Sequence, residues 1–117
     1  MMRAKGYVAE SKACDFLLAQ GLVAVVANYQ CRMGEIDLIM RDDDLFVFVE
    51  VRQRASHHFG DALESITVSK KNKILKTALF YMTLHQYYER FPMRFDVMGL
   101  TGDDEWRWIK NAFGADF

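Results

Sequence analysis

The feature that most constrains the fold is a pair of strand-like runs on either side of an acidic turn. The runs are Glu35 to Arg41 and Leu45 to Arg52, and three aspartates separate them. A two-residue turn at Asp43-Asp44 closes them into a tight antiparallel hairpin. In that register Asp37 lies directly opposite Glu50. The same register also pairs Glu35 with Arg52, Ile39 with Phe48, and Arg41 with Phe46.

This register separates apolar from charged side chains, because successive side chains of a strand point to opposite faces. One face is entirely aliphatic and is expected to be buried. It consists of Ile36, Leu38, Met40, Leu45, Val47, Val49 and Val51. The far end of the other face collects Glu35, Asp37, Glu50 and Arg52. A slip of one residue would bury these charges among aliphatic side chains, so the pattern favours this register.

The opposed carboxylates of Asp37 and Glu50 indicate a cation site. Directly opposed β-carbons lie about 4.5–5.5 Å apart, and two carboxylates that close repel each other unless a proton or a cation lies between them. Mg²⁺ suits such a position because it binds one or two carboxylates together with water and phosphate oxygens. The alternative is structural: Arg52 and a neighbouring lysine neutralise the pair, as in many ion-pair networks.

Glu10 is a candidate third ligand. The segment from Arg3 to Gln20 predicts a helix that ends at Gly21, a residue suited to the left-handed position after a helix. Glu10 shares the apolar stripe of this helix with Ala13, Cys14 and Leu17. An acid on a stripe that faces a sheet is unusual, since glutamate is rarely buried without a partner. The alternative is a residue at the edge of the stripe whose tip reaches water.

The remaining pattern predicts a single domain over residues 1–117, with strands and helices mixed. We expect a short strand over Leu22–Asn28, a long helix from an N-cap at Ser69 to about Arg90, and strands over Arg94–Thr101 and Trp106–Lys110. Ile74, Ala78, Tyr81 and Met82 follow helical spacing and are predicted core residues. Asp96, beside Arg94, is interpreted as a salt-bridge residue rather than a catalytic one. The result is a mixed α/β sheet with helices on its faces.

Composition narrows the class of protein without assigning a function. Hydrophobic residues make up 51% of the chain, which is enough for a packed core. No apolar run approaches the roughly 20 residues that a membrane helix needs, and the N-terminal residues lack the charged, then apolar, then small-residue pattern of a signal peptide. We therefore expect a cytoplasmic protein without a membrane partner. Cys14 and Cys31 are expected to be free thiols.

The net charge of −1, from 15 basic and 16 acidic residues, does not by itself indicate a nucleic-acid-binding protein. The lysines are nevertheless clustered. Lys70, Lys71, Lys73 and Lys76 crowd the start of the predicted long helix, where cations oppose the helix dipole. A phosphate backbone would reverse that penalty, so we predict DNA contacts there and at Arg3, Lys5 and Lys12. The alternative is a solvated basic face.

Several segments resemble the bacterial YraN-like family, an uncharacterised group related in fold to archaeal Holliday-junction resolvases and to the PD-(D/E)xK nucleases. The matching segments run through almost the whole chain. They are Lys5–Glu10, Gly34–Ile39, Val47–Arg52, Arg94–Val97 and Ile109–Phe113. The resemblance implies a restriction-endonuclease-like mixed β-sheet flanked by helices.

The resemblance also implies a catalytic set. Asp37 and Glu50 match the motif acids and Glu10 matches the helical glutamate, so these three would bind Mg²⁺ or Mn²⁺. Arg52 occupies the position of the motif lysine. Arginine keeps its proton and cannot act as a general base, but it can stabilise negative charge on a phosphate.

The implied function is a metal-dependent nuclease that hydrolyses DNA phosphodiester bonds. The analogy with resolvases further implies that it acts on branched DNA and forms a homodimer. Two other functions stay open. One is a non-catalytic nucleic-acid-binding module on a nuclease scaffold, which the arginine at position 52 suggests. The other is a protein-interaction or structural domain whose acids are neutralised internally.

Overall fold

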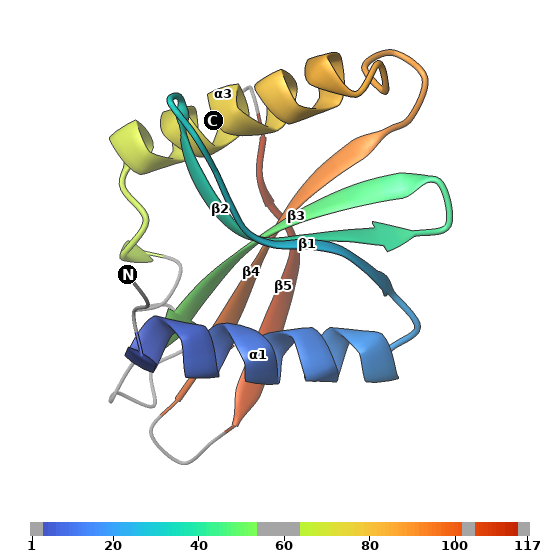
Figure 1. Cartoon of the computed structure of the whole chain (residues 1–117). Helices are drawn as coiled ribbons and strands as arrows, with labels where there is room; N and C mark the ends of the chain where they lie inside the picture. The colour runs from blue at the N-terminus through green and yellow to red at the C-terminus, as the bar shows by residue number, and fades with distance from the viewer. Residues whose placement is uncertain (1–3, 54–63, 102–104, 115–117) are drawn as a thin grey trace.

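The computed structural model describes residues 4–53, 64–101 and 105–114, which form a five-stranded sheet with a helix on each face (Figure 1). This arrangement confirms the predicted mixed α/β class. The elements, in chain order, are α1 (Ala4–Ala19), β1 (Val23–Cys31), β2 (Gly34–Asp42), β3 (Leu45–Gln53), α3 (Val68–Leu84), β4 (Met93–Leu100) and β5 (Trp106–Phe113).

The strands lie in the order β1-β2-β3-β4-β5, with β1 and β5 at the edges. Strands β1 with β2, β2 with β3, and β4 with β5 are antiparallel, whereas β3 and β4 are parallel. A parallel pair needs a crossover connection, and α3 lies within that connection. Strand β3 is therefore central, and the helix that follows it returns across one face of the sheet.

The hairpin register is confirmed over most of its length and ends just before the acids. Ile39 pairs with Phe48 and Arg41 with Phe46, as predicted, and Asp43 takes a left-handed backbone (φ 54°) in the turn. The ladder of paired residues stops at Leu38 and Val49. The predicted pairs Asp37 with Glu50 and Glu35 with Arg52 are therefore not part of it. A side chain replaces them: the Asp37 carboxylate accepts a hydrogen bond from the backbone of β3.

The hairpin is buried on both faces. Most of the predicted aliphatic face packs in the cluster that includes Ala13 and Leu17 of α1, namely Leu38, Met40, Val47 and Val49. The opposite face, with Ile39, Phe46 and Phe48, packs in the cluster of α3. Ile36 also belongs to that second cluster, against the prediction, because the regular pairing with β3 has ended before it. Leu45 and Val51, at the ends of the predicted face, are half-buried.

Helix α1 matches its prediction, and Gly21 after it has the expected left-handed backbone (φ 100°). Helix α3 begins earlier than predicted, because its N-cap is Thr67 and not Ser69. The Thr67 hydroxyl accepts a hydrogen bond from the backbone N–H of Lys70, at 3.1 Å. This cap fixes where the first turn of α3 begins and hence where Lys70 lies.

Helix α3 ends at Leu84, several residues before the predicted Arg90. Gln86 takes a left-handed backbone (φ 60°), and the N–H of Tyr87 donates to the carbonyl of Met82. The Tyr87 ring then stacks on Phe46, with ring centroids 4.9 Å apart. Packing against the sheet therefore overrides a helical pattern that the sequence continues. The predicted core residues Ile74, Ala78, Tyr81 and Met82 are all buried.

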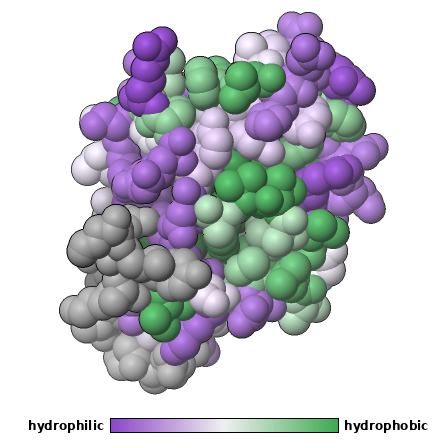
Figure 2. All heavy atoms as spheres, viewed as in Figure 1, coloured by the Kyte–Doolittle hydropathy of each residue, from purple (hydrophilic) through white to green (hydrophobic). Residues whose placement is uncertain are grey.

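The two short strands also run beyond their predicted limits, β1 to Cys31 and β5 to Phe113. Figure 2 shows apolar side chains gathered on the side of the molecule where β1 passes between the two helices, and the large apolar residues exposed on this edge strand are Val23 and Val25. No helix of the described residues is both long and apolar enough to cross a membrane.

The homodimer implied by the analogy with resolvases stays a prediction.

Candidate functional site

The two motif acids come together where β2 and β3 cease to pair. Asp37 and Glu50 are both buried, with exposed fractions of 8% and 5%. The backbone N–H of Val51 donates to Asp37 Oδ2 at 2.8 Å. This bond places the Asp37 carboxylate against β3, beside Glu50, and it uses only one of the two aspartate oxygens. The expected proximity of the two acids is therefore present, although a side-chain contact takes the place of the strand pairing.

Two cations hold the Glu50 carboxylate. Arg52 Nη2 lies 3.0 Å from Glu50 Oε2, and Lys70 Nζ lies 3.2 Å from the same oxygen. Arg52 reaches Glu50 because residues two apart on a strand share a face. Lys70 comes from the first turn of α3, on a different element. From the sequence we predicted Lys70 as a DNA contact and did not connect it to Glu50. The alternative in which internal cations neutralise the two acids did require a neighbouring lysine, but it did not specify which one.

The electrostatics of Glu50 are dominated by burial. The pKa of Glu50 is raised from its ordinary value of 4.5 to about 7, chiefly by removal from water and secondly by the nearby charge of Asp37. Lys70 and Arg52 lower the pKa of Glu50, but they do not outweigh the other two effects. The formal charges of the two acids and the two cations balance, so burial is the main reason for the raised pKa of Glu50, and a divalent cation beside the carboxylates would favour the ionised form.

This raised pKa predicts a pH dependence of stability. Between about pH 4.5 and about pH 7 the folded protein holds a proton on Glu50 that the unfolded chain releases, so the free energy of unfolding should fall as the pH rises through this window. Urea unfolding at several pH values measures it. Glu50→Gln should flatten this part of the profile, whereas Glu64→Gln, at an exposed acid, should leave it unchanged. An unaltered profile for Glu50→Gln would contradict the assignment.

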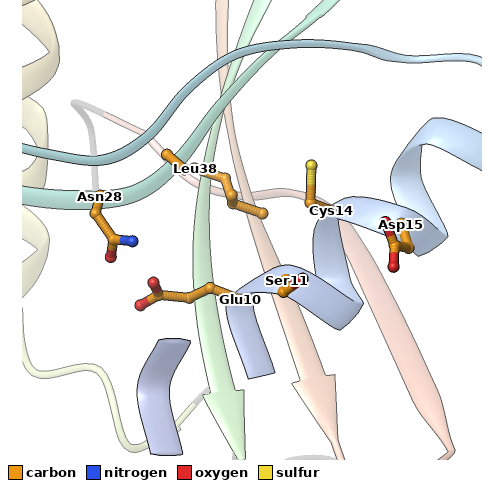
Figure 3. Close-up of a pocket in the computed structure, with 7 residues that line it drawn as sticks. Glu10, Ser11, Cys14, Asp15, Asn28 and Leu38 are labelled. Atoms are coloured by element: carbon orange, nitrogen blue, oxygen red, sulfur yellow. The ribbon is translucent and has the colours of Figure 1, made fainter. Parts of the chain in front are cut away.

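Glu10 is buried in α1, with an exposed fraction of 5%, so its tip does not reach water as the alternative required. It lines a pocket of about 170 Å³ together with Ser11, Cys14, Asp15, Ala27, Asn28 and Leu38. Figure 3 shows the Glu10 carboxylate directed towards Asn28 of β1. The neighbours of Asn28 pair with Leu38 and Ile36, so Asn28 lies level with Asp37 across the strands.

The pocket of Glu10 therefore borders the strand position of Asp37. Within the described residues, however, no three Asp, Glu, His or Cys side chains form a group that could hold a metal ion. The part that the structure brings together is the pair Asp37 and Glu50. The role of Glu10 as a ligand stays a prediction.

The predicted DNA-contacting lysines occupy different environments. Lys73 and Lys12 are exposed, whereas Lys71 is half-buried with its ammonium 5.9 Å from the centroid of the Phe113 ring. Lys5 belongs to α1, but its side chain, like the whole of Arg3, lies outside the described part of the chain. Contact with DNA stays a prediction for all of these residues.

Comparison with known proteins gives a consistent family. The model of the uncharacterised protein family UPF0102 matches residues 9–100. The chain is 47% identical to a UPF0102 protein of Legionella pneumophila over 116 residues, which covers 98% of each chain. It is 49% identical to a UPF0102 protein of Nitrosomonas europaea, covering 93% of this chain and 92% of the other. A UPF0102 protein of Coxiella burnetii is 39% identical, covering 96% and 93%.

Proposed function

Because the chain belongs to the uncharacterised protein family UPF0102, a membership that assigns no reaction, we propose its function from the site: a divalent-metal-dependent nuclease that hydrolyses DNA phosphodiester bonds. The observation that carries this proposal is the burial of Asp37 and Glu50 side by side where β2 and β3 separate. A restriction-endonuclease-like architecture, as the motif segments imply, is part of the proposal.

The residues present fit a hard divalent cation. In the described part of the chain, the polar contacts of the two acids use Asp37 Oδ2 and Glu50 Oε2. Asp37 and Glu50 would hold Mg²⁺ or Mn²⁺ through the oxygens that these contacts leave, since both ions accept one or two carboxylates and complete their shell with water and phosphate oxygens. When bound, such a cation would withdraw charge from a scissile phosphate and lower the pKa of a water molecule.

The protein's own groups supply orientation and charge. The N–H of Val51 holds the Asp37 carboxylate in one orientation, and the burial of Glu50 keeps its carboxylate in a region of low dielectric. Arg52 always carries its proton, so its part is to stabilise negative charge on the phosphate rather than to accept a proton. We assign the branched-DNA preference and the homodimer to the same proposal, on the analogy with resolvases alone.

One observation favours a second function, a nucleic-acid-binding module that does not cleave. Two internal cations already hold Glu50, and one of them is an arginine where the nuclease motif has lysine. If these cations permanently neutralise Asp37 and Glu50, no metal ion binds, and the basic residues of α3 serve only to bind nucleic acid.

A cleavage panel separates the two functions. Duplex, single-stranded, flapped and four-way-junction DNAs are incubated with the protein in Mg²⁺, in Mn²⁺, and in EDTA. The proposed nuclease cleaves at least one substrate with metal and none with EDTA. Binding without cleavage on the whole panel would favour the second function, and the absence of both would contradict each of them.

A further inference from the structure

Lys70 and Arg52 approach the same oxygen of Glu50 from different elements. Arg52 lies on β3, in the same strand as the acid, whereas Lys70 extends from the first turn of α3. A lysine is therefore present at the site even though the motif position carries arginine. The chain reaches this arrangement through tertiary packing of α3 on the sheet, not through the local motif.

Lys70 is the outermost of the three side chains. Its exposed fraction is 39%, compared with 23% for Arg52 and 5% for Glu50. A lysine ammonium is a compact charge on a flexible four-carbon stem, whereas the planar guanidinium of arginine binds in a fixed fork geometry. Lys70 can thus leave Glu50 by rotation about its own stem and stay beside the site, at its solvent-exposed side.

Lys70 also depends on an anion. Cations in the first turn of a helix oppose the helix dipole, and α3 has no acidic residue in its first turn. In the described part of the chain Glu50 is the acid that pairs with Lys70. A divalent cation on the carboxylates would compete with Lys70 for Glu50, and Lys70 would then need another anion.

We propose that Lys70 is a phosphate-contacting residue of this site: it pairs with Glu50 in the free protein and moves to the scissile phosphate when a divalent cation occupies the carboxylates. The inference rests on the proposed nuclease function. It assigns to a residue of α3 the stabilisation of negative charge on the phosphate, and it requires no change in the protonation of Lys70.

The test measures single-turnover cleavage and Mn²⁺ affinity, the latter without DNA, for Lys70→Gln, Lys70→Arg and Lys110→Gln. The last is the control, because Lys110 is an exposed lysine on the edge strand β5, outside the site and the predicted DNA contacts. Lys70→Gln should lower the cleavage rate by about a hundredfold, as the loss of one charge-stabilising donor typically does. Its Mn²⁺ affinity should be equal or higher, because a competing cation is gone. Lys70→Arg should retain most of the rate, and Lys110→Gln should match the wild type.

A compensating variant sharpens the test. Arg52→Lys introduced into Lys70→Gln should restore part of the lost rate, since it returns a lysine to the site from β3. Lys70→Gln that cleaves as fast as an active wild type would overturn the inference and leave the nuclease standing. Lys70→Gln that loses Mn²⁺ binding would show that Lys70 only maintains the structure of the site, and would also overturn the inference. A wild type that binds Mn²⁺ but cleaves nothing would overturn the proposed function and this inference with it.

Discussion

Replacing Asp37 with asparagine should lower metal-dependent cleavage by about a thousandfold or more. The change removes one charge of the carboxylate pair, and charge stabilisation by a bound divalent cation supplies several kcal/mol to such reactions, with each factor of ten worth about 1.4 kcal/mol. The asparagine carbonyl can still accept the hydrogen bond from the N–H of Val51, so the fold is expected to persist. Single-turnover cleavage of the best substrate of the panel measures the loss.

Glu50→Gln should behave in the same way, and Asp43→Asn serves as the matched control. Asp43 is an exposed aspartate in the turn of the same hairpin, with a left-handed backbone that asparagine also tolerates. Cleavage by Asp37→Asn at the wild-type rate would identify either a different site or a contaminating nuclease.

Replacing Asp96 with alanine should lower the free energy of unfolding by about 3–5 kcal/mol, the usual cost of removing one partner of a buried ion pair. Asp96 is fully buried and accepts hydrogen bonds from Arg94 Nε and Nη2, both at 2.8 Å. It also accepts from Trp108 Nε1 and from the backbone N–H of Asn111, both at 2.9 Å. These contacts join β4 to β5, and they confirm the interpretation of Asp96 as a salt-bridge residue.

Urea unfolding measures this loss against two comparisons. Asp96→Asn should cost less, because an amide oxygen can keep some of the accepted hydrogen bonds while the charge is lost. Asp44→Ala removes an exposed acid that lies 3.8 Å from Arg41, and its effect should stay within about 1 kcal/mol. A loss for Asp96→Ala as small as that for Asp44→Ala would contradict the structural role.

The hairpin register was predictable because it alone separates the charged side chains from the aliphatic ones. Moving either strand by one residue would bury Asp37 and Glu50 among aliphatic side chains, so one register is favoured. The burial of the second face was harder to foresee from alternation alone. A signal for it exists in the continuous apolar run from Phe46 to Val49, which is typical of a strand covered on both sides.

The limits of α3 were less predictable for local reasons. Thr67 and Ser69 are both good N-cap residues, so the sequence offers two starts separated by two residues. Its end depends on Tyr87, whose ring leaves the helical path to stack on Phe46 of β3. Nothing in the local pattern identifies that distant partner.

Some contacts of the candidate site were likewise predictable from the sequence and others were not. The proximity of Arg52 to Glu50 follows from strand geometry, whereas Asp37 lies beside Glu50 through its hydrogen bond from the N–H of Val51 and not through the predicted strand pairing. The contact of Lys70 with Glu50 depends on how α3 crosses the sheet after β3, which the spacing of residues does not specify. The charge of Lys70 at a helix start was visible in the sequence, but its partner was not.

The most direct test of the proposed metal site is the binding of Mn²⁺ to the purified protein, measured by calorimetry without nucleic acid. The wild type should show saturable binding that Asp37→Asn and Glu50→Gln each weaken strongly, while Asp43→Asn leaves the affinity unchanged. Saturable binding that neither substitution alters would place the metal elsewhere. The absence of saturable binding by the wild type would show that Arg52 and Lys70 neutralise the acids without a metal.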